Sequence, residues 1–210
     1  MTRPRLLDTF CGAGGCSVGY HRAGFEVVGV DNRPMPRYPF EFHQADALEF
    51  IAEHGREFDV IHASPPCQAY SNQANCWPGN EYPDLISATR GAILQTGNPY
   101  VIENVAGARN HLLASIMLCG KTFGLKVYRH RYFECRPFFL APAHILHRDS
   151  TPRSGRGKSP KGFISVAGHL SNTTYCREAM DIDWMTGAEL SQAIPPAYTQ
   201  WLGTRLLEAL

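Results

Sequence analysis

Short apolar runs alternate with more polar stretches through the first half of the chain. The apolar runs have the length and composition of buried strands and lie at 6–10, 25–31, 60–63 and 100–103. The intervening stretches are predicted to be helices and lie at about 16–23, 45–54 and 83–95. Strands that alternate with helices predict an α/β fold, with a mostly parallel sheet covered by helices on both faces.

The second half of the chain changes in composition. Residues 143–162 are rich in proline, serine, glycine and basic residues, which predicts a loop. Beyond the loop the sequence predicts a strand, two short helices and an amphipathic terminal helix, at 163–167, 179–184, 186–192 and 196–210. We therefore expect a single domain with a core at 1–142, a basic loop at 143–162 and a closing segment at 163–210.

Composition and charge narrow the range of partners. The net charge of +1 argues against a uniformly basic surface, so a nucleic acid would have to contact a local patch. The seven cysteines include no Cys-x-x-Cys pair, which favours reduced thiols and predicts no structural metal site. No run approaches the roughly 18 apolar residues of a membrane span. We expect a cytoplasmic protein without membrane contacts.

A glycine-rich turn follows the first predicted strand and reads Asp8-x-Phe10-x-Gly12-x-Gly14-Gly15. Asp31 ends the second strand, where its carboxylate would accept hydrogen bonds from two ribose hydroxyls, and Asp46 follows a third short strand, where it would receive an adenine amine. The alternative is a plain connection from strand to helix. The dinucleotide fingerprint has a further glycine that is missing here, so the turn suits adenosylmethionine, which lacks a pyrophosphate.

A cysteine follows the strand predicted at 60–63, in the segment Ser64-Pro65-Pro66-Cys67-Gln68. A thiol at the end of a buried strand can attack an electrophile when its surroundings favour the thiolate. Buried structural cysteines are also common and inert. The segment alone leaves both interpretations open.

Five motifs in this order and spacing resemble the cytosine carbon-5 DNA methyltransferase family. They are Asp8-Thr9-Phe10-Cys11-Gly12-Ala13-Gly14-Gly15, the pair Asp31 and Asp46, Pro65-Pro66-Cys67-Gln68-Ala69-Tyr70-Ser71, Glu103-Asn104-Val105, and Arg129-His130-Arg131. The resemblance implies a class I, Rossmann-like methyltransferase fold that uses S-adenosylmethionine and releases S-adenosylhomocysteine. It also implies duplex DNA with a flipped cytosine as the substrate.

The resemblance implies a role for each chemical group. Cys67 would add to carbon 6 of cytosine, because carbon 5 is otherwise a poor nucleophile. Glu103 would donate a proton to ring nitrogen 3, for which its carboxyl needs a raised pKa. Arg131 and Arg129 would polarise the carbonyl oxygen. A surface Arg-His-Arg in solvated salt bridges is the alternative for the arginines, and a bound water is the expected base.

The remaining expected contacts are also implied by the resemblance. The cofactor would be contacted by Asp8, Phe10, Gly12, Gly14, Asp31, Asn32, Asp46, Ala47, Pro66 and Gln192. The substrate would be contacted by Gln68, Ser71, Asn104, Arg153, Arg156 and Lys158. Residues 71–81 would form a loop that closes over the substrate. The tail reads Ser191-Gln192-Ala193-Ile194-Pro195-Pro196, with Ser and Gln where the family has Gly and Asn.

The chain departs from the family where a large target-recognition region is expected. Only 135–163 are available, and so short a region can scarcely build base-edge contacts, each worth about 1 to 3 kcal/mol. Three functions remain: DNA methylation with relaxed sequence preference, the same chemistry on RNA or a free cytidine nucleotide, and a non-catalytic binding module. The intact Cys67, Glu103 and Arg131 count against the third. A compact enzyme of this kind would suit a phage or mobile element that avoids restriction.

Overall fold

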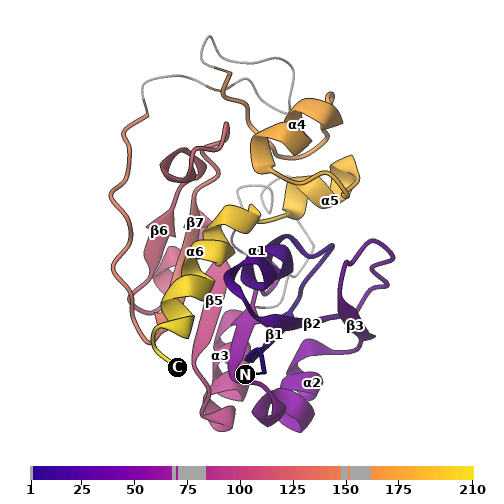
Figure 1. Ribbon diagram of the computed structural model, residues 1–210, viewed down its shortest axis with the longest axis vertical. Coiled ribbons are helices and arrows are strands. Elements are labelled where there is room, and N and C mark those ends of the chain that lie inside the picture. The colour runs from indigo at the N-terminus through magenta and orange to yellow at the C-terminus, as the bar shows by residue number, and fades with distance from the viewer. Residues whose placement is uncertain (1, 68–69, 71–83, 148–150, 152–161) are drawn as a thin grey trace.

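The computed structural model describes residues 2–67, 70, 84–147, 151 and 162–210. In this part of the chain seven strands form one sheet, in the order β3-β2-β1-β4-β5-β7-β6 (Figure 1). The strands are β1 Arg5–Thr9, β2 Glu26–Asp31, β3 Glu41–Gln44, β4 Val60–Ala63, β5 Tyr100–Asn104, β6 Ile116–Leu118 and β7 Arg131–Arg136. The first five strands pair in parallel, while β7 runs antiparallel to both of its neighbours.

Helices cover both faces of the sheet. α1 (Gly15–Ala23) and α6 (Pro196–Leu207) pack together on one face, and α2 (Ala47–His54) and α3 (Ile86–Thr96) lie on the other (Figure 1). Leu6 and its neighbour Leu7 are both fully buried, one in the core of each face. This explains why the strands read as continuous apolar runs and not as alternating ones.

The remaining elements are short. They are α4 (Thr173–Met180), α5 (Gly187–Gln192) and the 3₁₀ turns η1 (Gly55–Glu57), η4 (Ala106–His111) and η5 (Gly120–Phe123). α1 and α6 approach closely because Gly19 has no side chain: a Cβ there would collide with Thr199 Oγ1 and the carbonyl oxygen of Pro196. This contact joins the end of the chain to the first helix. Within the described residues, no helix has both the length and the apolar character to cross a membrane.

The predicted fold class is confirmed, and the differences lie in the second half of the chain. The strand predicted at 163–167 is reduced to one bridge between Val127 and Ile164. The helix predicted at 179–184 is wrong: α4 begins earlier, after the cap that Asn172 makes with the Tyr175 amide, and it ends at Asp181, whose φ of 57° is left-handed. The sequence prediction missed β6 and β7, which are short or mixed in polarity.

Candidate active site

The polar residues singled out by the sequence meet at one edge of the sheet because of its topology. The carboxyl ends of β1, β2, β4 and β5 share this edge, since these strands are parallel. β7 is antiparallel to β5, with Phe133 opposite Glu103, so β7 begins at the same edge. Arg131, the first residue of β7, therefore lies beside the end of β5.

A cavity of about 850 Å³ opens at this edge. It is lined by the glycine-rich turn, the segments after β2, β4 and β5, the start of β7 and residues around α5. The predicted residues that line it are Asp8, Phe10, Gly12, Asp31, Asn32, Asp46, Ala47, Pro66, Cys67, Glu103, Arg131 and Gln192. Three other predicted residues within the described part of the chain, Gly14, Asn104 and Arg129, do not.

The glycine-rich turn is tied to the end of β2 at the cavity. The Gly12 amide donates to Asp31 Oδ2 at 3.1 Å, and the Arg33 amide donates to Asp31 Oδ1 at 3.1 Å. Gly12 has a φ of +51°, and a Cβ built on it would meet no atom within 4 Å. Each oxygen of Asp31 thus accepts one backbone amide and retains a lone pair for a further donor.

Asp46 and Asp8 carry two further carboxylates to the cavity. Asp46 Oδ1 caps α2 by accepting from the amides of Leu48 and Glu49, at 2.8 and 3.1 Å, which is sufficient reason for an aspartate here. Asp8 is fully buried, with Oδ2 2.5 Å from Ser17 Oγ. Its Oδ1 has no hydrogen-bond partner among the described residues. Burial raises the pKa of Asp8 to about 7.

Glu103 and Arg131 form an ion pair in the lining of the cavity. Arg131 Nε lies 3.2 Å from Glu103 Oε1, but this oxygen accepts no hydrogen bond from the described residues. Only 7% of the Glu103 side chain is exposed. Burial raises the pKa of this carboxyl, and the Arg131 charge partly opposes the shift. Glu103 therefore combines the raised pKa of an acid with an oxygen that accepts no hydrogen bond from the described residues.

Cys67 lines the same cavity from the segment that follows β4. The segment is held at both ends, because the Ser64 amide donates to the Thr9 carbonyl at 3.1 Å and Asn104 Nδ2 donates to the Pro65 carbonyl at 3.0 Å. Burial raises the pKa of the Cys67 thiol, and the nearby Glu103 carboxylate raises it further. Arg131 acts in the opposite direction.

Three of the predicted site residues contact other parts of the chain in this structure, and the first two are Asn104 and Gly14. Asn104 Oδ1 accepts from the Val105 amide at 2.9 Å while Nδ2 holds Pro65, so its amide braces the Cys67 segment and does not face a substrate. Gly14 caps α1 and faces Pro39, where a Cβ would come within 2.8 Å of Cδ. Neither Asn104 nor Gly14 lines the cavity.

Arg129 is the third of these residues. It is partly buried, and its guanidinium donates to three backbone carbonyls: Ala193 at 2.7 Å, Ser191 at 2.8 Å, and Val166. Burial lowers the pKa of Arg129 to about 9. Since Ser191 and Ala193 line the cavity, Arg129 holds the tail in place over it and does not point into it.

The tail lies over the glycine-rich turn beside the cavity, and Gln192 is the residue of the tail that the sequence analysis named as a cofactor contact. Trp184 Nε1 donates to the Ala13 carbonyl at 2.8 Å, and a Cβ on Gly15 would lie 2.5 Å from the Ile194 carbonyl oxygen. Met185, Glu189 and Ile194 join the lining without having been predicted, as do Arg33, Pro34 and Met35. The position of 33–35 directly after Asp31 was the one available signal.

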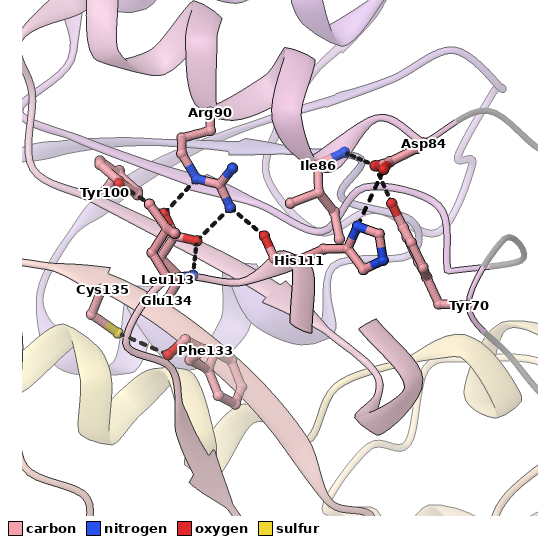
Figure 2. A network of polar contacts seen from close by, with 10 residues as sticks. All are labelled: Tyr70, Asp84, Ile86, Arg90, Tyr100, His111, Leu113, Phe133, Glu134 and Cys135. Carbon is pink, nitrogen blue, oxygen red and sulfur yellow. Dashed lines mark hydrogen bonds and ion pairs between the residues drawn. The ribbon is translucent and has the colours of Figure 1, made fainter. Parts of the chain in front are cut away.

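The Cys67 segment leads into residues whose placement lies outside the described part of the chain. Just beyond it, Tyr70 donates a hydrogen bond to Asp84 Oδ1, and His111 Nδ1 lies 3.3 Å from Asp84 Oδ2 (Figure 2). These contacts join Tyr70 to Asp84 and both to His111 in η4. Of the predicted substrate residues, Gln68, Ser71, Arg153, Arg156 and Lys158 lie outside the described residues, as does the loop at 71–81.

Comparison with known proteins adds the family. The model of the C-5 cytosine-specific DNA methylase family matches residues 4–118, more than half of the chain. The chain is 37% identical over 87 residues to the type II methyltransferase M.XorII of Xanthomonas oryzae, a match that covers 34% of this chain and 20% of that protein. It is 32% identical over 119 residues to M.HgiGI of Herpetosiphon aurantiacus, covering 50% of this chain and 93% of that sequence.

A solved structure extends the likeness of fold over nearly the whole chain. The protein, described as a candidate DNA modification methyltransferase encoded within an Escherichia coli prophage, superposes with a TM-score of 0.66 at 15% identity, covering 98% of this chain and 99% of the other. The strands β1, β2, β4 and β5, whose carboxyl ends meet at the cavity, lie in the half of the sequence that the family model matches. This chain belongs to the C-5 cytosine-specific DNA methylase family.

Proposed function

We propose that the chain is a DNA (cytosine-5-)-methyltransferase that moves a methyl group from S-adenosylmethionine to carbon 5 of cytosine through a covalent adduct with Cys67. The observation that carries the proposal is the convergence of Cys67, Glu103 and Arg131 on one cavity. A thiol, a buried acid and a fixed cation are the groups that activation of a cytosine ring requires.

The other end of the cavity suits the cofactor. S-adenosylmethionine supplies an electrophilic methyl group on a sulfonium when it binds. Asp31 has the free lone pairs to accept from ribose hydroxyls, and the open backbone at Gly12 allows close approach. The buried, unpartnered Oδ1 of Asp8 would accept from a donor on the cationic methionine part. Phe10, Asn32, Asp46, Ala47, Pro66 and Gln192 would complete the contacts.

The charges of Cys67 and Glu103 are coupled. Each raises the energy of the other's anionic form, because like charges in a buried site resist joint ionisation. The pair therefore shares one negative charge more readily than it carries two. The state with the proton on Glu103 and the charge on Cys67 is the reactive one, since it holds both the nucleophile and the acid. Arg131 stabilises that charge on Cys67.

The chemical steps follow from these positions. The Cys67 thiolate forms a bond to carbon 6 while Glu103 passes its proton to ring nitrogen 3 and Arg131 stabilises the carbonyl oxygen. Carbon 5 would then be electron-rich and would take the methyl group that S-adenosylmethionine, held by Asp31 and Asp8, would supply, with S-adenosylhomocysteine as the product. A water removes the proton from carbon 5, the double bond reforms, and the thiolate leaves. The proton on nitrogen 3 returns to Glu103.

The nature of the substrate is the second part of the proposal. The family supports DNA, and a cytosine reaching Cys67 would have to leave a duplex stack. The described residues between β7 and α4, at 137–147, 151 and 162–172, contain no regular element of a recognition domain. RNA and a free cytidine nucleotide, which need no such domain, are therefore the second candidate substrates.

One experiment tests both parts. The purified chain is incubated with S-adenosylmethionine labelled in the methyl group and, separately, with duplex DNA, tRNA and free cytidine nucleotides, and the digested products are searched for 5-methylcytosine. We expect label in DNA. Label only in tRNA or nucleotide would replace DNA with that substrate, and label in none of them would overturn the catalytic proposal.

Matched cysteine variants identify the nucleophile in that experiment. Cys67→Ser should abolish the label, whereas Cys135→Ser, which changes a buried thiol on β7 outside the cavity, should retain it. Circular dichroism of both variants checks that they fold. Full activity in a folded Cys67→Ser variant would exclude the covalent route.

A further inference from the structure

Four metal-binding side chains gather at the sheet edge, outside the active-site cavity. They are Cys119, His130, His144 and His147, and one ligand atom from each lies within 4.8 Å of those of the others. Cys119 directly follows β6 and caps η5, and His130 directly precedes β7. His144 and His147 belong to the irregular segment after β7. Three separate parts of the chain thus converge on one point.

The spacing of the donor atoms fits a tetrahedral ion. Cys119 Sγ lies 3.2 Å from His147 Nε2, and His144 Nε2 lies 3.2 Å from the same nitrogen. In a tetrahedral zinc site the bond lengths place neighbouring donors about 3.3 to 3.6 Å apart. The four donor atoms lie within 4.8 Å of one another, so some of the side chains would have to move inward to bind an ion together.

Hydrogen bonds within the cluster do not satisfy all four groups. His147 Nε2 faces both Cys119 and His144, yet a neutral imidazole nitrogen either donates one hydrogen bond or accepts. His130 Nε2 is buried and has no hydrogen-bond partner among the described residues. A cation between the four would accept electron pairs from all of them at once.

Cys119 is the one member of the cluster that can carry a negative charge as a ligand. An ionised Cys119 would offset one charge of a divalent ion, so the ion would add only one net positive charge there.

We propose that Cys119, His130, His144 and His147 bind one Zn²⁺ in a structural site. One thiolate with three imidazoles is a borderline-soft, four-coordinate donor set, and Zn²⁺ prefers such sets in closed tetrahedral sites. Binding releases the proton of the Cys119 thiol to solvent. The sequence analysis predicted no metal site because the chain contains no Cys-x-x-Cys pair. The one local signal is the spacing of His144 and His147 in a segment otherwise read as a loop.

The ion would fix the segment after β7 against the sheet. Residues 137–147 run along the outside of the molecule past β6 and β7 (Figure 1). His130 lies between Arg129, which holds the tail, and Arg131, which pairs with Glu103. A bound ion would therefore fix the start of β7 from the side opposite the cavity.

Metal content of the full chain tests the proposal. The protein is expressed without a histidine tag, and its metals are measured by mass spectrometry. We expect one zinc per chain. After removal with a chelator, Co²⁺ serves as the probe: strong visible bands of a tetrahedral ion and a thiolate charge-transfer band are expected, and Zn²⁺ should displace both. Weak octahedral bands, or no uptake of either ion, would overturn the proposal.

Paired variants assign the ligands. His144→Ala changes an exposed side chain and should fold, and His169→Ala is its control, an exposed histidine outside the cluster. Since loss of a second-shell partner costs roughly 10 to 100-fold in affinity, loss of a ligand should weaken Co²⁺ binding by about 100-fold or more. Cys119→Ser should remove the charge-transfer band, while Cys135→Ser should retain it. Equal binding by His144→Ala and His169→Ala would contradict the assignment.

Discussion

Cys67 and Cys119 occupy similar places in the fold and have different neighbours. Each follows a strand, β4 and β6 respectively, at the same edge of the sheet. Burial raises the pKa of both thiols. Cys67 lines the cavity next to a carboxyl group and a guanidinium, whereas Cys119 is buried beside three histidines. The backbone brings both thiols to the same edge of the sheet. The side chains around each thiol determine which reaction or ligand it suits.

The difference lies in how each thiolate is stabilised. At Cys67 the stabilising charge is Arg131, which is already paired with Glu103, so the thiolate forms when Glu103 is neutral. At Cys119 the neighbours are three imidazoles, whose ring nitrogens can bind a metal, so a metal ion would stabilise a thiolate there. We infer that the first thiol attacks carbon and the second binds a cation.

Loss of the nucleophile should produce the largest effect. In Cys67→Ser, methyl transfer should fall by roughly 10³-fold or more, because a serine hydroxyl at neutral pH does not add to carbon 6. Binding of Zn²⁺ should be unchanged. Initial rates with labelled S-adenosylmethionine and metal content measure the two effects. A parallel loss of zinc would show that the two cysteines are not independent.

Replacing Glu103 should slow methyl transfer and at the same time make the Cys67 thiol easier to ionise. Glu103→Gln should lower the methyl-transfer rate by about 10² to 10⁴-fold, as expected for loss of general acid catalysis. It should also lower the pKa of Cys67, because an anion that disfavours the thiolate is gone. The pH dependence of Cys67 alkylation, followed by mass spectrometry, measures this shift.

Arg131→Met provides the opposite case. Removing the cation should raise the pKa of Cys67 and slow alkylation at neutral pH. The Cys119 thiol should respond to neither substitution when zinc is bound. Shifts of the same sign in Glu103→Gln and Arg131→Met would contradict the assigned electrostatics.

Removal of zinc should affect stability more than chemistry. An ion that binds only the folded chain stabilises it by about 4 kcal/mol when its free concentration is about 1,000 times Kd. Chelation should therefore lower the thermal midpoint of the wild-type chain and leave that of Cys119→Ser unchanged. Calorimetry with and without chelator measures the effect. Equal midpoints for the wild-type chain under both conditions would contradict a structural ion.

The smallest expected effect concerns Asp8 and pH. Its pKa of about 7 means that the buried carboxyl is largely protonated at pH 6 and largely ionised at pH 8. The cationic cofactor should bind the ionised form better, so its affinity should rise over this range by at most about tenfold per pH unit. Calorimetric titration of wild type and Asp8→Asn measures it. Affinity that falls with pH would exclude contact between Asp8 and the cationic part.

The strands in the first half of the molecule could be predicted because each is recognisable from its own short stretch of sequence. The strands β1, β2, β4 and β5 are buried on both faces, so each is a continuous apolar run. Their parallel order then brings Asp31, Cys67 and Glu103 to one edge. The residue types at the strand ends indicated candidates for this part of the site, and the resemblance to the family supplied their roles.

The second half depends on contacts between distant residues. Glu134 on β7 is 2% exposed and would read as a surface residue, yet Arg90 donates to it at 2.8 and 2.7 Å and the Tyr100 hydroxyl at 2.9 Å (Figure 2). Arg129 is similar, because its partners are backbone carbonyls at 166, 191 and 193 that no pattern near it indicates. The cluster of Cys119 and three histidines is likewise assembled from separate segments.

A trapped reaction intermediate tests the central claim most directly. DNA in which every cytosine carries fluorine at carbon 5 is incubated with the chain and S-adenosylmethionine, because fluorine cannot leave as a proton does and the adduct persists. We predict a complex stable to denaturation, in which peptide mass spectrometry finds a methylated nucleotide on Cys67. Methylation of ordinary DNA without any such adduct, or an adduct on Cys119 or another cysteine, would contradict the account.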